Sequence, residues 1–188
     1  MNRPNRGKFL IASLTRPQPE ENAVTTEDDV RYGAAATGWP SIHQRVLAAF
    51  AKGWDTPEPH AWDTLMTENI ELNQPLLLPG TTRKTWHDEA QRLVTLLPDI
   101  RGEVTSWAGH EDIMFIELRL SATLGGKPLR FRAVDKLWLT PTGTVLRRDS
   151  YFDSGPLIQA VLRRPSAWLP WWRSGLGPFL GRRRFLDR

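Results

Sequence analysis

The segments FIELRL (115–120), AVDKLWL (133–139) and VLRRDSYFD (145–153) decide the fold of this 188-residue chain. In the first two of them apolar residues largely alternate with polar residues, and this period of two is typical of a β-strand with one buried face. Two stretches with the composition of hairpin turns, Gly125-Gly126 and Pro141-Thr142-Gly143, separate the segments. The pattern therefore predicts consecutive antiparallel strands at about 102–108, 112–123, 128–140 and 144–152.

Helical spacing replaces this alternation on the N-terminal side of the strands. Apolar residues recur at helical intervals from Trp86 to Leu97, and Pro98 ends the pattern. The same reasoning predicts three further elements: a helix from Ser41 to about Lys52, a short helix that begins at Thr56, and an edge strand at 70–74.

One ordered domain with two dissimilar ends is expected. Residues 1–38 are rich in polar residues and proline, which predicts a disordered leader. Residues 39–165 hold the periodic segments and finish with a helix that follows Asp153. Residues 166–188 form a basic tail rich in tryptophan and arginine. Because the helices come first and the antiparallel strands follow, the predicted fold class is α+β.

The net charge of +4 comes from the C-terminal end. Residues 163–188 contain seven arginines and one aspartate, so they carry +6 and the rest of the chain carries −2. A nucleic-acid-binding domain should have a basic face of its own, and nucleic acid is therefore not expected as a partner. The tail suits either peripheral contact with a membrane surface or packing of its tryptophans on the domain.

Several kinds of site are unexpected. The chain has no cysteine, which excludes disulfides and thiolate metal sites. Its histidines, at positions 43, 60, 87 and 110, are scattered and form no ligand motif, so neither a metal nor another cofactor is predicted. No apolar run approaches the roughly 20 residues of a membrane-spanning helix, and a cytoplasmic location is expected.

These strand segments, together with FAKGWD at 50–55 and PLIQAVL at 156–162, resemble the nuclear transport factor two-like superfamily in its SnoaL-like branch. The resemblance covers about residues 40–162. It implies a curved antiparallel sheet that helices wrap into a cone with an internal pocket, and a homodimer formed through the sheet. Polyketide cyclases, ketosteroid isomerases, limonene epoxide hydrolases and non-catalytic modules share this fold, so the resemblance leaves the function open.

Asp135 is the first candidate for a catalytic residue. It is the one acid in a strand row that is otherwise apolar: Phe131, Ala133, Leu137 and Leu139. The side chain should therefore point into the pocket, where a carboxyl can act as a general acid or base. The segment that contains it also resembles the ketosteroid isomerase strand that carries a pocket acid. The alternative is a structural carboxylate held by a buried arginine or tyrosine.

Glu117 and Tyr151 are the other two catalytic candidates. The resemblance to limonene epoxide hydrolase implies a carboxylate near Glu117 within an R-x-D motif, but Phe115 stands where that motif has arginine. Ser150 stands where the second carboxylate of the hydrolase precedes the tyrosine. A Tyr151 hydroxyl in the pocket can polarise a carbonyl group or position a water molecule. The alternatives are a solvent-facing or interface role for Glu117 and a core position for Tyr151.

Several residues are candidates for substrate binding. Large aromatic side chains make good pocket walls, and the candidates of this kind are Trp54, Trp62 and Trp107, with Trp86 in the same elements. Asn73, with its neighbour Gln74, can supply a polar contact from the first strand, and His60 lies on the short second helix. For each tryptophan, packing in the core is the alternative.

Two functions follow from these residues. The first is a cofactor-free enzyme of the cyclase, isomerase, hydratase or hydrolase type, which acts on a small hydrophobic molecule with Asp135 as its acid or base and Tyr151 as its helper. The second is a non-catalytic ligand-binding or protein-interaction module, associated with a membrane through its basic tail.

Overall fold

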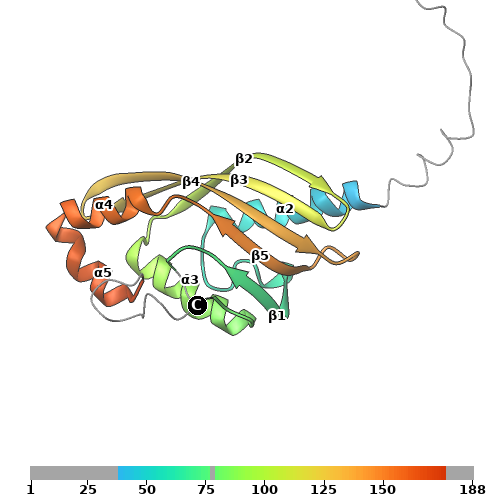
Figure 1. Cartoon of the computed structure of the whole chain (residues 1–188), viewed down its shortest axis with the longest axis horizontal. Helices are drawn as coiled ribbons and strands as arrows, with labels where there is room; N and C mark the ends of the chain where they lie inside the picture. The colour runs from blue at the N-terminus through green and yellow to red at the C-terminus, as the bar shows by residue number, and fades with distance from the viewer. Residues whose placement is uncertain (1–37, 77–78, 177–188) are drawn as a thin grey trace, which may run out of the picture. The chain divides into compact units, whose positions relative to one another are not determined.

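The four strands predicted between residues 102 and 152 are all present and form one sheet with the earlier strand (Figure 1). The computed structural model describes residues 38–76 and 79–176. The predicted leader and the last twelve residues of the tail, 177–188, lie outside them. In chain order the elements are α2 (Trp39–Asp55), η2 (Asp63–Leu65), β1 (Met66–Asn73), α3 (Arg83–Leu96), β2 (Arg101–His110), β3 (Ile113–Leu124), β4 (Lys127–Leu139), β5 (Val145–Tyr151), α4 (Gly155–Arg163), η3 (Pro165–Ala167) and α5 (Trp168–Ser174).

The sheet is mixed, with the strand order β1-β5-β4-β3-β2. Strands β2 to β5 pair with their neighbours in antiparallel fashion, as predicted. Strand β1 pairs with β5 in parallel, so the expectation of a wholly antiparallel sheet was wrong at this edge. Alternation along a strand specifies which face is buried but not the direction of the neighbouring strand, and mixed sheets of this kind are common.

Helices α2 and α3 cover one face of the sheet, which we call the inner face. In Figure 1 the long strands β2, β3 and β4 curve across α2. Buried and accessible side chains alternate along the whole of β3. Ile116, Leu118 and Leu137, which are among the most buried apolar side chains of the sheet, belong to the inner face. Burial of these alternate residues against the helices accounts for the fold of the central strands.

Helix α2 continues beyond its predicted end. The sequence predicts an end near Lys52, but the helix includes Gly53 and finishes at Asp55. A Cβ atom at Gly53 would overlap the indole ring of Trp62. Trp62 uses that space to donate a hydrogen bond from Nε1 to the carbonyl oxygen of Phe50, at 3.1 Å. The glycine is therefore needed for close packing inside the helix and does not end it.

The second helix expected from Thr56 does not form as an α-helix. Only the three residues Asp63–Leu65 are helical, as a single 3₁₀ turn, and turns precede them. Pro59 follows Glu58, and a proline disfavours the helical conformation of the residue before it. Burial of Trp62 and Leu65 holds this segment in place without a regular helix.

The packed domain continues past its expected boundary at residue 165. Helix α4 ends at Arg163 as predicted, and α5 then returns alongside α3 (Figure 1). Trp171 and Leu176 are buried and belong to the main hydrophobic core, and Arg92 of α3 donates a hydrogen bond to the carbonyl oxygen of Ser174 at 3.4 Å. The first part of the predicted tail is therefore a structural part of the domain. Across 38–76 and 79–176, no helix combines the length and apolar character needed to cross a bilayer.

Candidate functional site

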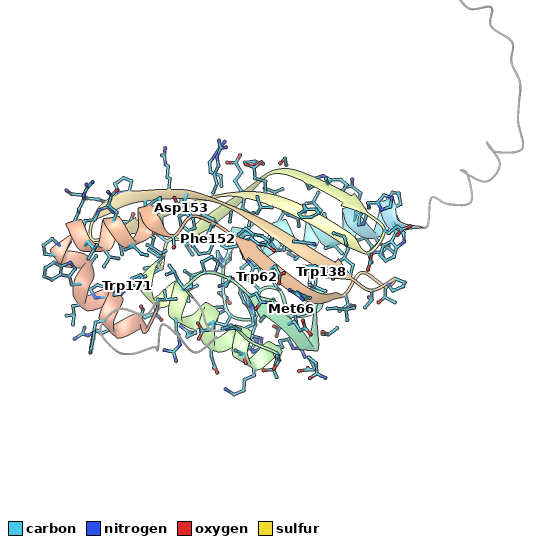
Figure 2. All side chains as sticks on the ribbon, in the orientation of Figure 1. Trp62, Met66, Trp138, Phe152, Asp153 and Trp171 are labelled. Carbon is cyan, nitrogen blue, oxygen red and sulfur yellow. The ribbon has the colours of Figure 1, made fainter. Side chains whose placement is uncertain are left out.

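A cavity of about 60 Å³ lies between the inner face of the sheet and helices α2 and α3. One water molecule needs roughly 10–15 Å³ on the same scale, so there is room for several waters or a compact ligand. The wall is almost wholly apolar. Its hydrophobic part includes Trp54, Trp86, Leu97, Leu118, Ala133 and Phe152, the last labelled in Figure 2 between β5 and α4. Its polar part consists of Gln74, Arg148 and Ser150.

Arg148 is the central polar residue of this wall. It lies on β5, and its side chain is only 10% exposed. Its Nε donates to Oδ2 of Asp135 at 2.9 Å and its Nη2 donates to Oδ1 at 3.1 Å, which makes a bidentate pair. Nη1 donates to Oε1 of Gln74 at 2.9 Å. The guanidinium carbon also lies 5.1 Å from the centre of the Trp86 ring, a distance typical of a cation–π contact.

Asp135 holds this arginine in place from outside the cavity. The carboxylate is fully buried, and it accepts a further hydrogen bond from the hydroxyl of Ser150. Ser150 is its direct neighbour across the β4–β5 ladder. Arg148 and Ser150 line the cavity, whereas Asp135 is not among its lining residues. The carboxylate therefore neutralises and orients the guanidinium, the arrangement that the sequence left open as the alternative to catalysis.

Two buried hydrogen-bond donors on the cavity wall have no acceptor. The indole Nε1 atoms of Trp54 and Trp86 are buried and make no hydrogen bond in the described structure, and both side chains line the cavity. Buried donors in folded proteins are nearly always paired with a protein group or an ordered water. A ligand or water oxygen that reached either N–H group would therefore be stabilised by a hydrogen bond.

Tyr151 and Glu117 lie on the opposite face of the sheet from the cavity, so the expected Asp135–Tyr151 pair was wrong. Tyr151 is opposite Val134 in the ladder and 57% exposed. Glu117 accepts a hydrogen bond from the hydroxyl of Ser106 at 2.8 Å. The physical reason is the alternation of β5. Ser150 faces inward beside Asp135, and the next residue must face outward.

The remaining candidates divide between the cavity and other places. Trp54 lines the cavity, and Trp62 (labelled in Figure 2) lines a smaller space of about 20 Å³ that shares Trp54 and Arg148 with it. Trp107 lines neither of these spaces. It is partly exposed, and its ring centroid lies 6.2 Å from that of His43. His60 is exposed and also lies outside both spaces, where it contacts Asp63.

Arg148 and Ser150 are the site residues that sequence reasoning missed, whereas Gln74 and Trp86 were expected near the pocket and do line the cavity. A signal for the two missed residues was available, because they are two residues apart on β5 and so share one strand face. Only the register, which places Ser150 beside Asp135, identifies that face as the inner one. Without the register, Arg147 and Tyr151 are equally good candidates.

Asn73 belongs to a polar cluster on the outer side of the sheet. Its Nδ2 donates to Oδ1 of Asp149 at 3.1 Å. Arg147 donates to the same carboxylate from Nε at 3.0 Å and from Nη2 at 2.8 Å. The hydrogen bonds from Arg147 are the main cause that holds the pKa of Asp149 below its usual value. Partial burial opposes this shift, and the Asn73 amide adds to it.

Replacing Asp149 with asparagine is expected to lower the free energy of unfolding by about 1 kcal/mol at pH 7, because it removes the charge that pairs with Arg147. The effect is modest because the Arg147 side chain is partly exposed to solvent. Since the folded pKa of Asp149 is depressed, its contribution is complete above the unfolded pKa, about 3.9, and is lost as the pH falls through the folded value. Urea unfolding at pH 7 and pH 3 should show the difference shrinking. An unchanged difference at pH 3 would contradict the assignment, and Asp55→Asn, at an exposed helix end, is the control.

No family model and no curated protein sequence matches this chain. Solved structures do match it. A candidate SnoaL-like polyketide cyclase from Jannaschia sp. CCS1 is 17% identical, with a TM-score of 0.56 over 68% of this chain and 93% of that protein. A protein of ketosteroid isomerase-like fold from Catenulispora acidiphila is 18% identical, with a TM-score of 0.55 over 61% and 91%. TerC, co-crystallised with polyporic acid, is 14% identical, with a TM-score of 0.58 over 64% and 98%.

The matched proteins are covered almost completely, so the likeness extends over the whole domain and not over one motif. In this chain the fold consists of a five-stranded mixed sheet with helices on its inner face and a cavity between them. The comparisons therefore identify the chain as having the α+β fold of SnoaL-like and ketosteroid isomerase-like proteins.

Proposed function

We propose that this chain binds a small, mainly apolar molecule that carries a carbonyl group, in the cavity lined by Arg148 and Trp86. The observation that carries the proposal is the set of donors on an otherwise apolar wall. The indole N–H groups of Trp54 and Trp86 lack acceptors in the described structure, and the Arg148 guanidinium lines the same cavity. A ligand with a carbonyl oxygen would satisfy such donors, while its apolar part would occupy the hydrophobic wall.

The charge of the site favours a neutral ligand. Asp135 makes a bidentate pair with Arg148, so the two charges cancel within the wall. An anionic ligand would have to be desolvated without a net positive partner, which is costly in a buried site. The guanidinium nevertheless keeps a hydrogen on Nη1 beyond the one given to Gln74. A neutral carbonyl oxygen can accept that hydrogen without introducing a charge.

The structural relatives support a small-molecule role of this kind. TerC has the same fold and was co-crystallised with polyporic acid. Several other neighbours are candidate polyketide cyclases. Because the fold hosts many activities, the ligand class is inferred from the residues of this cavity and not from those names.

Acetophenone and ethylbenzene form a pair of probes that tests the proposal, since they differ chiefly in the carbonyl oxygen. The indole N–H signals of the nine tryptophans can be followed by proton–nitrogen correlation NMR. We expect acetophenone to shift two of them downfield in a saturable way. Trp54→Phe and Trp86→Phe assign these signals, because phenylalanine keeps an aromatic ring and removes the donor.

Ethylbenzene should enter the cavity without those shifts, and Trp86→Phe should weaken acetophenone binding while leaving ethylbenzene binding unchanged. Loss of one neutral hydrogen bond predicts a weakening of about 5-fold, which corresponds to roughly 1 kcal/mol. Trp107→Phe, outside the cavity, is the matched control. Identical responses to both probes, or no saturable response to either, would overturn the proposal.

A cofactor-free enzyme is the second candidate, and one contact favours it. Ser150 lines the cavity and its hydroxyl donates to Asp135. The hydroxyl can therefore take a proton from a carbon next to the ligand carbonyl while passing its own proton to the carboxylate. Arg148 and the indole donors would stabilise the enolate oxygen that results. In this form Asp135 remains the base expected from the sequence, with Ser150 in the place expected of Tyr151.

Exchange of the acetophenone methyl protons in D₂O tests this second candidate, because it measures proton abstraction without knowledge of the natural substrate. Asp135→Asn should abolish any exchange above the rate in buffer, and Glu117→Gln, on the outer face, should not. Saturable acetophenone binding with no accelerated exchange would favour a binding module over an enzyme.

A further inference from the structure

Two imidazoles and one carboxylate meet at the surface beside η2. Nδ1 of His60 lies 2.9 Å from Oδ2 of Asp63, and Nε2 of His87 lies 2.6 Å from Oδ1 of the same residue. The ring centroids of the two histidines are 4.0 Å apart. One donor atom from each of the three residues lies within 4.8 Å of the others. Two of the four histidines in the chain therefore contact the same carboxylate.

Different elements hold these three side chains in place. His60 belongs to the turn before η2, Asp63 is the first residue of η2, and His87 lies on α3. Arg83, at the start of α3, donates from Nη1 to the backbone carbonyl of Asp63 at 3.2 Å and so fixes the carboxylate against that helix. Burial alone would raise the pKa of Asp63, but the hydrogen bonds from His87 and His60 outweigh it, and the pKa is lowered.

We propose that His60, Asp63 and His87 form a binding site for a divalent transition-metal ion of the zinc type. Imidazole nitrogen and carboxylate oxygen are ligands that Zn²⁺ prefers, and three protein ligands plus water complete its coordination. Tetrahedral zinc separates its ligand atoms by roughly 3.3 Å. The observed nitrogen–oxygen separations of 2.9 and 2.6 Å need an increase of less than one ångström, and the two histidine donor atoms, which lie within 4.8 Å of each other, need to approach by about 1.5 Å at most. His60 can supply this movement, because its side chain is 71% exposed.

The sequence predicted no metal site because positions 60, 63 and 87 match no ligand motif. Residues 60 and 63 lie on a segment that was expected to be α-helical, and residue 87 lies on a different helix. Only the packing of η2 against α3 brings them together, through the Trp62–Trp86 contact beneath them, whose ring centroids are 5.7 Å apart. A bound ion would therefore cross-link the segments that carry Trp62 and Trp86, two of the three tryptophans that line the smaller space.

Isothermal titration of the untagged full-length chain with ZnCl₂ is the direct test. The chain has no cysteine and only two other histidines, so background binding is low. We expect one Zn²⁺ per chain. His60→Ala and His87→Ala should each weaken binding about tenfold or more, since even residues that only support a ligand contribute that much. His110→Ala, which removes an exposed histidine elsewhere, should leave the affinity unchanged.

Substitution of Co²⁺ supplies a second readout that does not depend on heat. Coordination by two imidazoles and a carboxylate should give visible absorption bands that disappear in His87→Ala. The exposed position of His60 makes His60→Ala a variant that should fold normally, and circular dichroism would verify this. No stoichiometric binding up to millimolar Zn²⁺, or equal binding by wild type and both histidine variants, would overturn the proposal.

Discussion

Replacing Arg148 with methionine is expected to lower the free energy of unfolding by about 3–5 kcal/mol, because it leaves the Asp135 carboxylate buried without its cationic partner. Asp135 is fully buried, and the two hydrogen bonds from Arg148 satisfy both of its oxygens. Ser150 alone would then solvate the charge. Urea unfolding followed by circular dichroism at pH 7 measures the loss.

An exposed arginine gives a matched control. Arg119→Met makes the same substitution on β3, where the Arg119 side chain is 52% exposed and its partner Glu103 is 68% exposed. It should cost about 1 kcal/mol or less. Combining Arg148→Met with Asp135→Leu should recover most of the loss, because an apolar pair of similar volume often replaces a buried ion pair without penalty. If the double variant were no more stable than Arg148→Met alone, an unpaired charge would not be the cause of the instability.

The faces of the central strands could be predicted from sequence because burial repeats every second residue. The row that contains Asp135 is indeed the buried one, and the row that contains Glu117 is the more accessible. The parallel pairing of β1 with β5 could not be predicted. Strand β1 has few alternating residues, and the direction in which it pairs depends on the path that the chain takes through α3. Pairing partners are a property of the assembled sheet and not of a strand's own sequence.

The candidate site was predictable only in part, for a related reason. Asp135 stands out because its own strand is apolar, whereas Arg148 lies in a run of four polar residues, RRDS at 147–150. In that run, the alternation that identifies an inward residue is hidden. Assigning Arg148 and Ser150 to the cavity requires the β4–β5 register. The His60–Asp63–His87 cluster was harder to predict, because Asp63 and His87 are 24 residues apart in the sequence and strand β1 lies between them.

Replacing Trp171 with alanine is expected to lower the free energy of unfolding by about 3–5 kcal/mol, although the residue lies in the segment whose composition suggested a tail. Trp171 is 2% exposed and belongs to the main core cluster (Figure 2). Helix α5 has only seven residues, too few for independent stability, so tertiary packing must hold it. Loss of the indole would leave a cavity between α5 and α3 that the short helix can only partly fill.

Trp172 provides the comparison, because it is the next residue on the same helix and is 38% exposed. Trp172→Ala should cost about 1 kcal/mol or less, as is usual for substitutions near the surface. Equal effects of the two substitutions on the urea midpoint would mean that α5 does not pack on the domain.

The packing of α5 also bears on the membrane contact that the composition of the tail suggested. Since Trp171 is buried in the core, the exposed large apolar side chains among the described residues of this segment are Trp168, Leu169 and Trp172. Substituting these three residues should therefore reduce liposome binding without unfolding the domain, and unchanged binding would exclude α5 as the contact.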